Sequence, residues 1–359
     1  MLTTDWVEIG AIIILLLLSL PLNGIALIRL LKIWRDGRNA VRTKQEITRT
    51  GFLWLKIHLT IIDLIVILCY CPSKLGWLIS YVWKGGDFLC KGVQYSWLFC
   101  FHLMSFAVVS IALDRLRTVY RLMHIEKTGK NIGRSTNQLF LVKKLILFCY
   151  IGAALFSLPQ WFVWTVEDFG SFSQCTTIWH VERTNIYLKT REHVMEFAGE
   201  RLYSLIHLLT VFWIPFAILF FAYLYIVVCL YWYSLRPYTV STGIDSTYLR
   251  TSEEDSSENH TLWQKSAPSP SIPISNIVRK SSSVHVPAWR IEMRSRMFHT
   301  SIHVIAAYLI CWMPYNVLAL ATFLSSYLQI KISTELEVLR VCVLFNTLLN
   351  PFIYGFRKN

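Results

Sequence analysis

One acidic residue lies deep inside a long apolar stretch of this 359-residue chain, where a charge is costly and is a functional candidate by default. Asp63 follows Leu59-Thr60-Ile61-Ile62, and no cation close to it in that stretch can neutralise it. It must face other helices, next to a polar group or a bound cation. Asn346 and Asn350 are four residues apart on one helix face, and we expect them to be its partners. A protonated Asp63 that serves only packing is the alternative.

A second pair of charges, Asp114-Arg115, ends another apolar stretch. Adjacent opposite charges can hold each other until a partner takes the arginine. The dipeptide alone would equally fit an exposed ion pair, which contributes almost nothing to stability.

Seven of the nine cysteines lie within the apolar stretches; the other two are Cys90, at the outer start of one stretch, and Cys175, in the connection after the next. Both fall on the side of the chain that the charge pattern below assigns to the cell exterior, where disulfides persist. We expect them to pair and to close a loop of about 85 residues, a link that contributes roughly 4 kcal/mol in the chain-entropy model.

The elements that must position these residues are apolar blocks. Hydrophobic residues make up 54% of the chain and charged residues 16%, against about 25% in a soluble domain. A bilayer crossing takes roughly 20 residues. Seven blocks are long enough: 8–31, 52–73, 88–119, 139–164, 202–232, 297–324 and 335–356. Prolines that should kink helices fall at Pro72, Pro159, Pro215, Pro314 and Pro351.

Positive charge is concentrated on one side of these blocks. On one side of the blocks, the connections and the C-terminal tail together hold twenty-four Lys and Arg residues, mainly in 32–51, 115–144 and 233–300. The segments on the other side hold eight. The excess marks the cytoplasmic side. We therefore predict an all-α, multi-pass plasma-membrane protein, a seven-helix bundle with its N-terminus outside and its C-terminus inside.

The predicted organisation is a short extracellular segment over 1–7, a transmembrane domain over 8–356 and a cytoplasmic tail over 357–359. One connection, about 238–288, is rich in hydroxyl and acidic residues. It cannot bury much apolar area, so we expect a disordered cytoplasmic loop.

Other classes of protein fit the chain less well. It has no Gly-rich phosphate loop and no nucleophile motif, which argues against an enzyme. A transporter is the main rival, and transporters tend to carry inverted repeats that this chain lacks. Nucleic acid is not expected as a partner, because the basic charge lies beside anionic membrane lipid.

Three motifs, taken in order, resemble those of rhodopsin-like G-protein-coupled receptors: Asp114-Arg115-Leu116, Cys311-Trp312-Met313-Pro314-Tyr315 and Asn350-Pro351-Phe352-Ile353-Tyr354. Single residues stand where that family has its helix-one Asn, helix-two Asp and helix-five Pro and Tyr: Asn23, Asp63, Pro215 and Tyr223. Ser105 and Tyr308 replace the Ile and Phe that are usual next to Pro215.

The resemblance implies roles for these residues. Arg115 would leave Asp114 and engage a heterotrimeric G protein when the sixth helix swings outward. Trp312 and Pro314 would transmit ligand contact to that swing. Tyr223 and Tyr354 would form contacts in the active state, and Asn350 and Pro351 would be part of the switch. A central polar network, with a sodium ion at Asp63, would consist of Asn23, Asp63, Asn346 and Asn350.

Within that family the chain is similar to gonadotropin-releasing-hormone receptors and their adipokinetic and vasopressin-like relatives. The similarity lies in Phe88-Leu89-Cys90-Lys91, Phe172-Ser173-Gln174-Cys175 and Ser157-Leu158-Pro159-Gln160. It implies an extracellular neuropeptide as ligand; another peptide or a non-peptide ligand is the alternative.

We also predict a binding cavity with a basic wall. Lys74 and Arg340 belong to helices that are neighbours in this fold, so two cations would face one cavity and hold a ligand carboxylate or carbonyl cluster. The polar and aromatic lining would come from Gln94, Trp97, Gln160, Trp312, Tyr315 and Asn316. Alternatively, Arg340 pairs with Glu337 and Lys74 extends outward.

Overall fold

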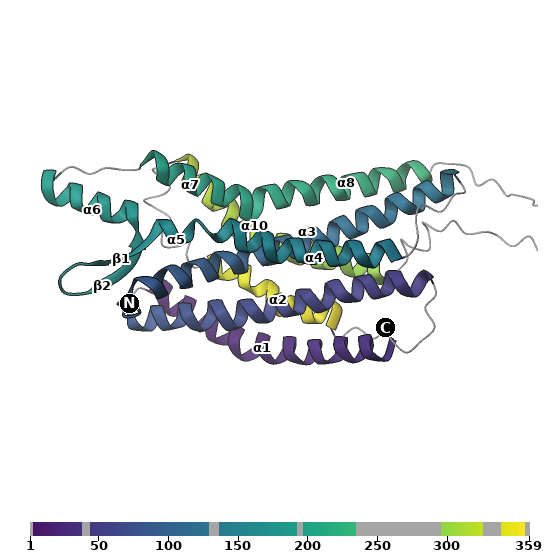
Figure 1. Ribbon diagram of the computed structural model, residues 1–359, viewed down its shortest axis with the longest axis horizontal. Helices are drawn as coiled ribbons and strands as arrows, with labels where there is room; N and C mark the ends of the chain where they lie inside the picture. The colour runs from purple at the N-terminus through teal and green to yellow at the C-terminus, as the bar shows by residue number, and fades with distance from the viewer. Residues whose placement is uncertain are drawn as a thin grey trace, which may run out of the picture.

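The structure is a computed structural model that describes residues 3–37, 44–128, 136–191, 197–234, 296–325 and 339–355. Long helices lie side by side as a bundle (Figure 1). In chain order the elements are α1 (Thr3–Gly37), α2 (Lys44–Ser80), α3 (Gly86–Thr128), α4 (Thr136–Ser157), α5 (Gln160–Val163), β1 (Trp164–Asp168), β2 (Ser173–Thr177), α6 (Ile178–Thr190), α7 (Ala198–Leu208), the π-helix η1 (Leu209–Trp213), α8 (Ile214–Ser234), α10 (Arg296–Leu324) and the π-helix η3 (Pro351–Gly355).

Within these described ranges, six helical spans are long and apolar enough to cross a membrane, and a shorter apolar helix covers Leu339–Ile353. Side chains such as Leu17, Ile28 and Ile310 are about 70% exposed, as expected of apolar residues that face lipid. The third span, Gly86–Arg121, is the most buried of the six and contacts helices on several sides. It therefore forms the centre of the bundle.

Two of the predicted apolar blocks do not form one continuous α-helix. Block 139–164 was expected to be one helix, but α4 ends at Ser157 and Pro159 caps the separate short helix α5. In the fifth block, η1 precedes Pro215, whose missing N–H disturbs the regular hydrogen-bond pattern of a helix. Pro72 and Pro314 lie inside α2 and α10 as expected.

The connection between α4 and α7 forms elements that the sequence did not suggest. β1 pairs with β2 antiparallel, and Val166 lies opposite Cys175. α6 follows at once, with the Thr177 side chain as its N-cap and left-handed Arg191 at its end. We call the end of the bundle that carries this sheet and α6 the hairpin end; the start of α1 lies there too (Figure 1).

Some predicted boundaries shift or go untested. α1 begins at Thr3, so residues 3–7, which are predicted to form a short extracellular segment, are helical. The predicted disordered loop, about 238–288, and the tail 357–359 lie outside the described residues.

Candidate functional site

A cavity of about 430 Å³ opens between α3, α7, α10 and the helix Leu339–Ile353 at the hairpin end. Seven of the eight residues predicted to bind ligand line it: Gln94, Trp97, Gln160, Trp312, Tyr315, Asn316 and Arg340. Pockets for small ligands are typically about 300–1,000 Å³. The volume therefore suits a small molecule or a few residues at one end of a peptide.

Lys74 is the predicted binding residue that the lining lacks. Its Nζ lies 3.2 Å from the carboxylate of Glu8 on α1, and both side chains are largely buried. The same ammonium lies 5.6 Å from the ring centre of Trp97, which lines the cavity. Of the two cations in the predicted basic wall, Arg340 lines the cavity and Lys74 does not. Contact of either residue with a ligand stays a prediction.

Three polar groups, from α3, α5 and α10, lie buried at the cavity without a protein partner. Gln160 donates to the hydroxyl of Tyr203 at 2.6 Å through Nε2, which leaves its Oε1 without a hydrogen bond. The Nε2 of Gln94 and the indole Nε1 of Trp312 are also buried and unbonded. Buried polar groups are nearly always bonded. These three are therefore available to a ligand or to water.

Charged residues also line the cavity. Arg340 donates to the hydroxyl of Tyr315 at 3.3 Å and lies 5.4 Å from the centre of its ring. Arg201 lies at the mouth of the cavity, 5.6 Å from the ring centre of Phe323. Glu200 also lines the cavity, and Arg183 of α6 lies 2.5 Å from its carboxylate.

The sequence reasoning missed the contribution of α7 to the cavity. Glu200, Tyr203, Ser204 and His207 all line it, and their spacing of three and four residues puts them on one helix face. That polar spacing is visible in the sequence. The predicted fifth helix begins at residue 202, after Glu200, and the sequence prediction places no ligand contact on its first turns.

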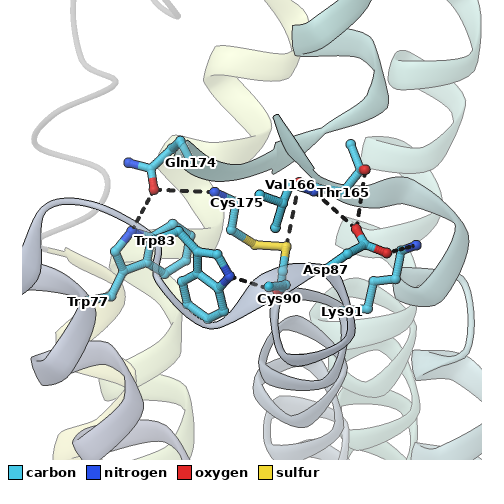
Figure 2. Close-up of a disulfide and its surroundings, with 10 residues drawn as sticks. Trp77, Trp83, Asp87, Cys90, Lys91, Thr165, Val166, Gln174 and Cys175 are labelled. Atoms are coloured by element: carbon cyan, nitrogen blue, oxygen red, sulfur yellow. Dashed lines mark hydrogen bonds and ion pairs between the residues drawn. A yellow bond between two sulfur atoms is a disulfide. The ribbon is translucent and has the colours of Figure 1, made fainter. Parts of the chain in front are cut away.

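A disulfide fixes the sheet over α3. Cys90 and Cys175 are bonded, with their Cα atoms 5.6 Å apart, as predicted (Figure 2). Gln174 accepts a hydrogen bond from the indole of Trp77 at 3.2 Å, and the N–H of Trp83 bonds to the carbonyl of Ser173 at 2.9 Å. The sheet is thus tied to the end of α2 as well as to α3.

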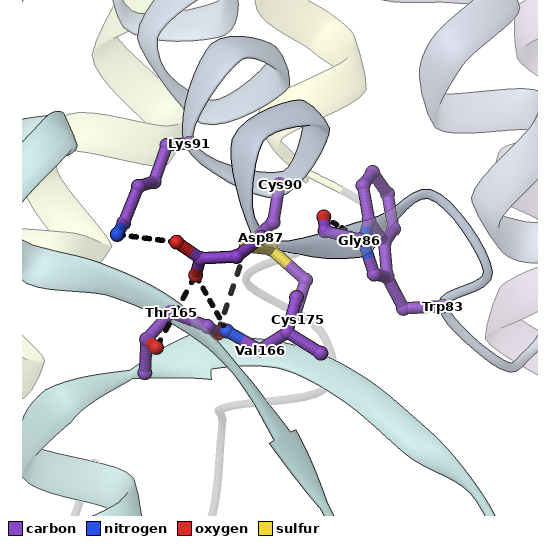
Figure 3. Close-up of polar contacts among 8 residues, drawn as sticks. All are labelled: Trp83, Gly86, Asp87, Cys90, Lys91, Thr165, Val166 and Cys175. Carbon is purple, nitrogen blue, oxygen red and sulfur yellow. Dashed lines mark hydrogen bonds and ion pairs between the residues drawn. A yellow bond between two sulfur atoms is a disulfide. The ribbon is translucent and has the colours of Figure 1, made fainter.

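Asp87 adds a second attachment at the first turn of α3. Its carboxylate accepts hydrogen bonds from Val166 N at 3.1 Å and Thr165 Oγ1 at 3.3 Å, and Lys91 lies 2.5 Å away (Figure 3). These bonds join β1 to the same helix that carries Cys90. The position of β1 matters because Trp164, its first residue, lines the cavity.

An aromatic cluster lies beneath the cavity. The Trp312 ring packs 4.9 Å from that of Tyr308 and 6.3 Å from that of Phe212, which belongs to η1. The Tyr308 hydroxyl is hydrogen-bonded to Ser105 of α3 at 3.0 Å, and both residues are fully buried. The two residues that replace the family's Ile and Phe therefore form a polar contact between α3 and α10.

The predicted central network divides into two groups. Asn350 donates to both oxygens of Asp63, at 3.1 and 3.0 Å, and both residues are fully buried. Asn23 instead donates to the carbonyls of Ser19 and Thr347, at 2.8 and 2.9 Å. Asn346 is buried, and its Oδ1 has no hydrogen-bond partner. A sodium ion at Asp63 stays a prediction.

Asp114 and Arg115 form a direct ion pair that is almost completely buried. The guanidinium also lies 4.6 Å from the ring centre of Phe52 on α2. Burial makes this pair unlike an exposed one, because a buried charge whose partner is removed becomes strongly destabilising. Of the other predicted switch residues, Tyr223 is half-buried on α8 and Pro351 begins η3, while the side chain of Tyr354 lies outside the description.

The chain is similar to known receptors over nearly all its length. It is 29% identical to the G-protein coupled receptor daf-38 of Caenorhabditis elegans, over 98% of this chain and 89% of that protein. It is 24% identical to a gonadotropin-releasing hormone receptor of Octopus vulgaris and 22% identical to cephalotocin receptor 2 of the same animal. Those matches cover 86% and 83% of this chain, but 63% and 59% of the two octopus proteins.

A family model for the seven-transmembrane receptors of the rhodopsin family matches residues 40–354. That span contains the cavity, the disulfide and the Asp114–Arg115 pair. The family consists of signalling receptors of the plasma membrane and not of enzymes. This chain belongs to the rhodopsin family of G-protein-coupled receptors.

Proposed function

We propose that this receptor binds an extracellular peptide, whose terminal residues enter the cavity at the hairpin end. The observation that carries the proposal is the cavity itself, in which amide side chains of Gln94 and Gln160 with unbonded polar atoms lie beside aromatic residues. Amides of this kind match the donors and acceptors of a peptide backbone. Similarity to receptors named for gonadotropin-releasing hormone and cephalotocin supports a peptide ligand.

The hairpin end would face the outside of the cell. Its Cys90–Cys175 disulfide suits an oxidising compartment. The excess of Lys and Arg in the opposite set of connections suits the cytoplasm. This orientation puts the N-terminus outside and requires an odd number of crossings, so the helix Leu339–Ile353 would be part of the seventh.

Signalling would pass from the cavity through the aromatic cluster to Arg115. A ligand shifts a conformational equilibrium only if it binds one state more tightly than the other. Trp312 both lines the cavity and packs on Tyr308, so a ligand that displaces Trp312 would strain the Ser105–Tyr308 contact between α3 and α10. Outward movement of α10 would then let Arg115 leave Asp114 and engage a G protein.

Calcium release in cells that express the full chain tests the proposed ligand class. The cells are challenged with peptides of the gonadotropin-releasing, adipokinetic, vasopressin and unrelated types. A potent response to a peptide should weaken at least about fivefold in the Gln160→Ala variant, because one good hydrogen bond to a ligand contributes roughly 1 kcal/mol or more. Lys84→Ala, an exposed change between α2 and α3, is the matched control.

Equal potency in wild type and Gln160→Ala would contradict the proposal that the peptide binds in the cavity. No response to any peptide, with surface expression confirmed, would argue for a non-peptide ligand. That alternative is favoured by one observation, since a volume of about 430 Å³ holds only part of a peptide but can hold a whole small molecule.

A further inference from the structure

Trp97 of α3 is the residue through which α2 can act on the cavity. Its side chain lines the cavity and is 6% exposed. Among the described lining residues none belongs to α2, yet Tyr70, Ser73, Lys74 and Trp77 of α2 all interact with the Trp97 side chain. Residues outside the lining therefore support a ring that forms part of the cavity wall.

The polar edge of Trp97 is turned toward α2. Its indole Nε1 donates a hydrogen bond to the hydroxyl oxygen of Ser73, and the two atoms are 2.7 Å apart. An indole has a single N–H and no acceptor. Because this donor is used by Ser73, Trp97 offers a ligand ring surface and no hydrogen bond.

Ser73 acts as the acceptor in this bond because its own proton is already used. Its hydroxyl donates to the carbonyl of Cys69 at 2.6 Å, and the carbonyl of Tyr70 lies 3.1 Å away. A serine hydroxyl that bonds back to its own helix is fixed in direction. Ser73 also follows Pro72, which has no N–H and disturbs the backbone bonds of α2. The lone pairs of the hydroxyl oxygen are left for the indole N–H.

Aromatic and charged groups of α2 hold the ring itself. The rings of Tyr70 and Trp77 have their centres 5.0 and 5.5 Å from that of Trp97. The ammonium of Lys74 lies 5.6 Å from the same ring centre, within the range of attraction between a cation and an aromatic ring. Such contacts tolerate several ring orientations, whereas a hydrogen bond is directional. The bond to Ser73 is therefore the contact that fixes where the N–H edge points.

We propose that Ser73 is a positioning residue of the binding site, which holds the N–H edge of Trp97 on α2 and keeps this donor out of the cavity. Buried polar groups are nearly always bonded, so an indole that loses Ser73 should turn toward another acceptor. That turn would change the cavity wall that a ligand meets. The proposal rests on the proposed function, in which the cavity is the agonist site.

Nuclear magnetic resonance of the indole groups tests the position of Trp97 without any ligand. The full chain is labelled with 15N-tryptophan and placed in lipid nanodiscs, and the Trp97 signal is assigned by its loss in Trp97→Phe. In Ser73→Ala the Trp97 indole proton should move upfield and exchange faster with deuterium, because its hydrogen bond is lost. Ser73→Thr keeps a hydroxyl that can bond to the helix and should keep the wild-type signal.

Ser96→Ala is the matched control for this measurement. Ser96 precedes Trp97 on α3, and its hydroxyl donates to the carbonyl of Val93 at 2.8 Å, within the same helix. Its loss should leave the Trp97 signal where it is. An equal shift in Ser96→Ala and Ser73→Ala would mean that the signal reports loosening of the helices and not the bond.

Calcium release tests the consequence for binding, with the most potent peptide of the panel described above as agonist. Ser73→Ala should lower its potency at least about fivefold, the effect of losing one hydrogen bond. Ser73→Thr should restore the potency. Phenylalanine has no N–H to satisfy, so Ser73→Ala should have no further effect in a Trp97→Phe background.

An unchanged Trp97 signal in Ser73→Ala, or potency losses that add in the double variant, would overturn the proposal. A changed signal with unchanged potency would equally overturn a role for Ser73 in the binding site. Silence of the cells toward every peptide would contradict the peptide ligand of the proposed function, and the indole signal would still decide whether Ser73 positions Trp97.

Discussion

At the scale of single residues, the contact between Ser105 and Tyr308 distinguishes this chain from the motif it resembles. Apolar residues are usual at both positions, whereas here a hydrogen bond of 3.0 Å joins α3 to α10 in a fully buried setting. The bond coexists with the Asp114–Arg115 pair, in which the arginine is held. We therefore propose that the contact belongs to the resting arrangement of the bundle.

Tyr308→Phe and Ser105→Ala should each raise the signalling of the receptor without agonist. A typical hydrogen bond contributes about 1 kcal/mol, so its loss should shift the equilibrium about fivefold toward the signalling state. The measurement is basal G-protein activation normalised to surface expression.

The double variant supplies the control for this prediction. Because both changes remove the same bond, Ser105→Ala combined with Tyr308→Phe should add little to either alone. Additive increases, or basal activity that stays at the wild-type level in both single variants, would contradict the assigned role.

Sequence patterns could identify single residues better than pairs. Trp312 and Arg340 were expected at the cavity because their helical spacing and their motifs fix the face on which they lie. The partner of Lys74 could not be foreseen, because Glu8 is the first residue of the predicted first helix and nothing in the sequence places it beside Lys74 of the second. Such pairs depend on how the helices pack against one another, and the residue pattern of a single helix does not show this.

At the scale of elements, α6 is held against α7 by two contacts. Arg183 lies 2.5 Å from Glu200, and the Trp179 ring packs 5.5 Å from that of Tyr203. Both partners on α7 line the cavity, and none of the α6 residues is fully buried. An exposed helix of 13 residues is unstable alone, so these contacts are what should order it.

Arg183→Gln should therefore loosen α6. Its ion pair is partly exposed and contributes at most about 1 kcal/mol. We expect amide hydrogen exchange over residues 178–190 to become about two- to fivefold faster, because local opening costs less. Hydrogen exchange followed by mass spectrometry measures this directly.

Lys189→Gln is the matched change for this experiment, since Lys189 lies in the last turn of the same helix. It should leave the exchange rate unaltered. Equal acceleration in both variants would mean that helix propensity, rather than the contact with Glu200, governs the order of α6.

The sequence did not reveal β1, β2 or α6, although it predicted the disulfide between Cys90 and Cys175. Each strand is five residues long, and the sheet is fixed by distant groups such as Asp87 and Trp83. Short strands held by tertiary contacts carry little local pattern. The membrane helices were predictable because the thickness of the bilayer imposes their length and composition.

At the scale of the whole molecule, orientation decides which end meets the ligand. An epitope tag joined to the N-terminus should bind antibody on intact cells. A tag inserted between residues 238 and 288 should bind only after the cells are permeabilised, because these positions lie on opposite sides of the predicted bundle.

In the matched experiment, antibody binding to each tag is compared in cells with and without detergent, at equal surface levels of the receptor. Antibody that reaches the N-terminal tag only in permeabilised cells would reverse the orientation. Antibody that reaches both tags on intact cells would contradict the odd number of crossings that separates them.

The central claim is that occupation of the cavity is transmitted to a G protein through Arg115. It is tested most directly by nucleotide exchange on a purified heterotrimeric G protein, using the full chain and an agonist peptide, with Lys144→Ala on α4 as the matched control. In the wild type and in Lys144→Ala, agonist should accelerate exchange; in Arg115→Ala, exchange should stay at its basal rate while agonist binding persists. Equal acceleration in Arg115→Ala would contradict the account.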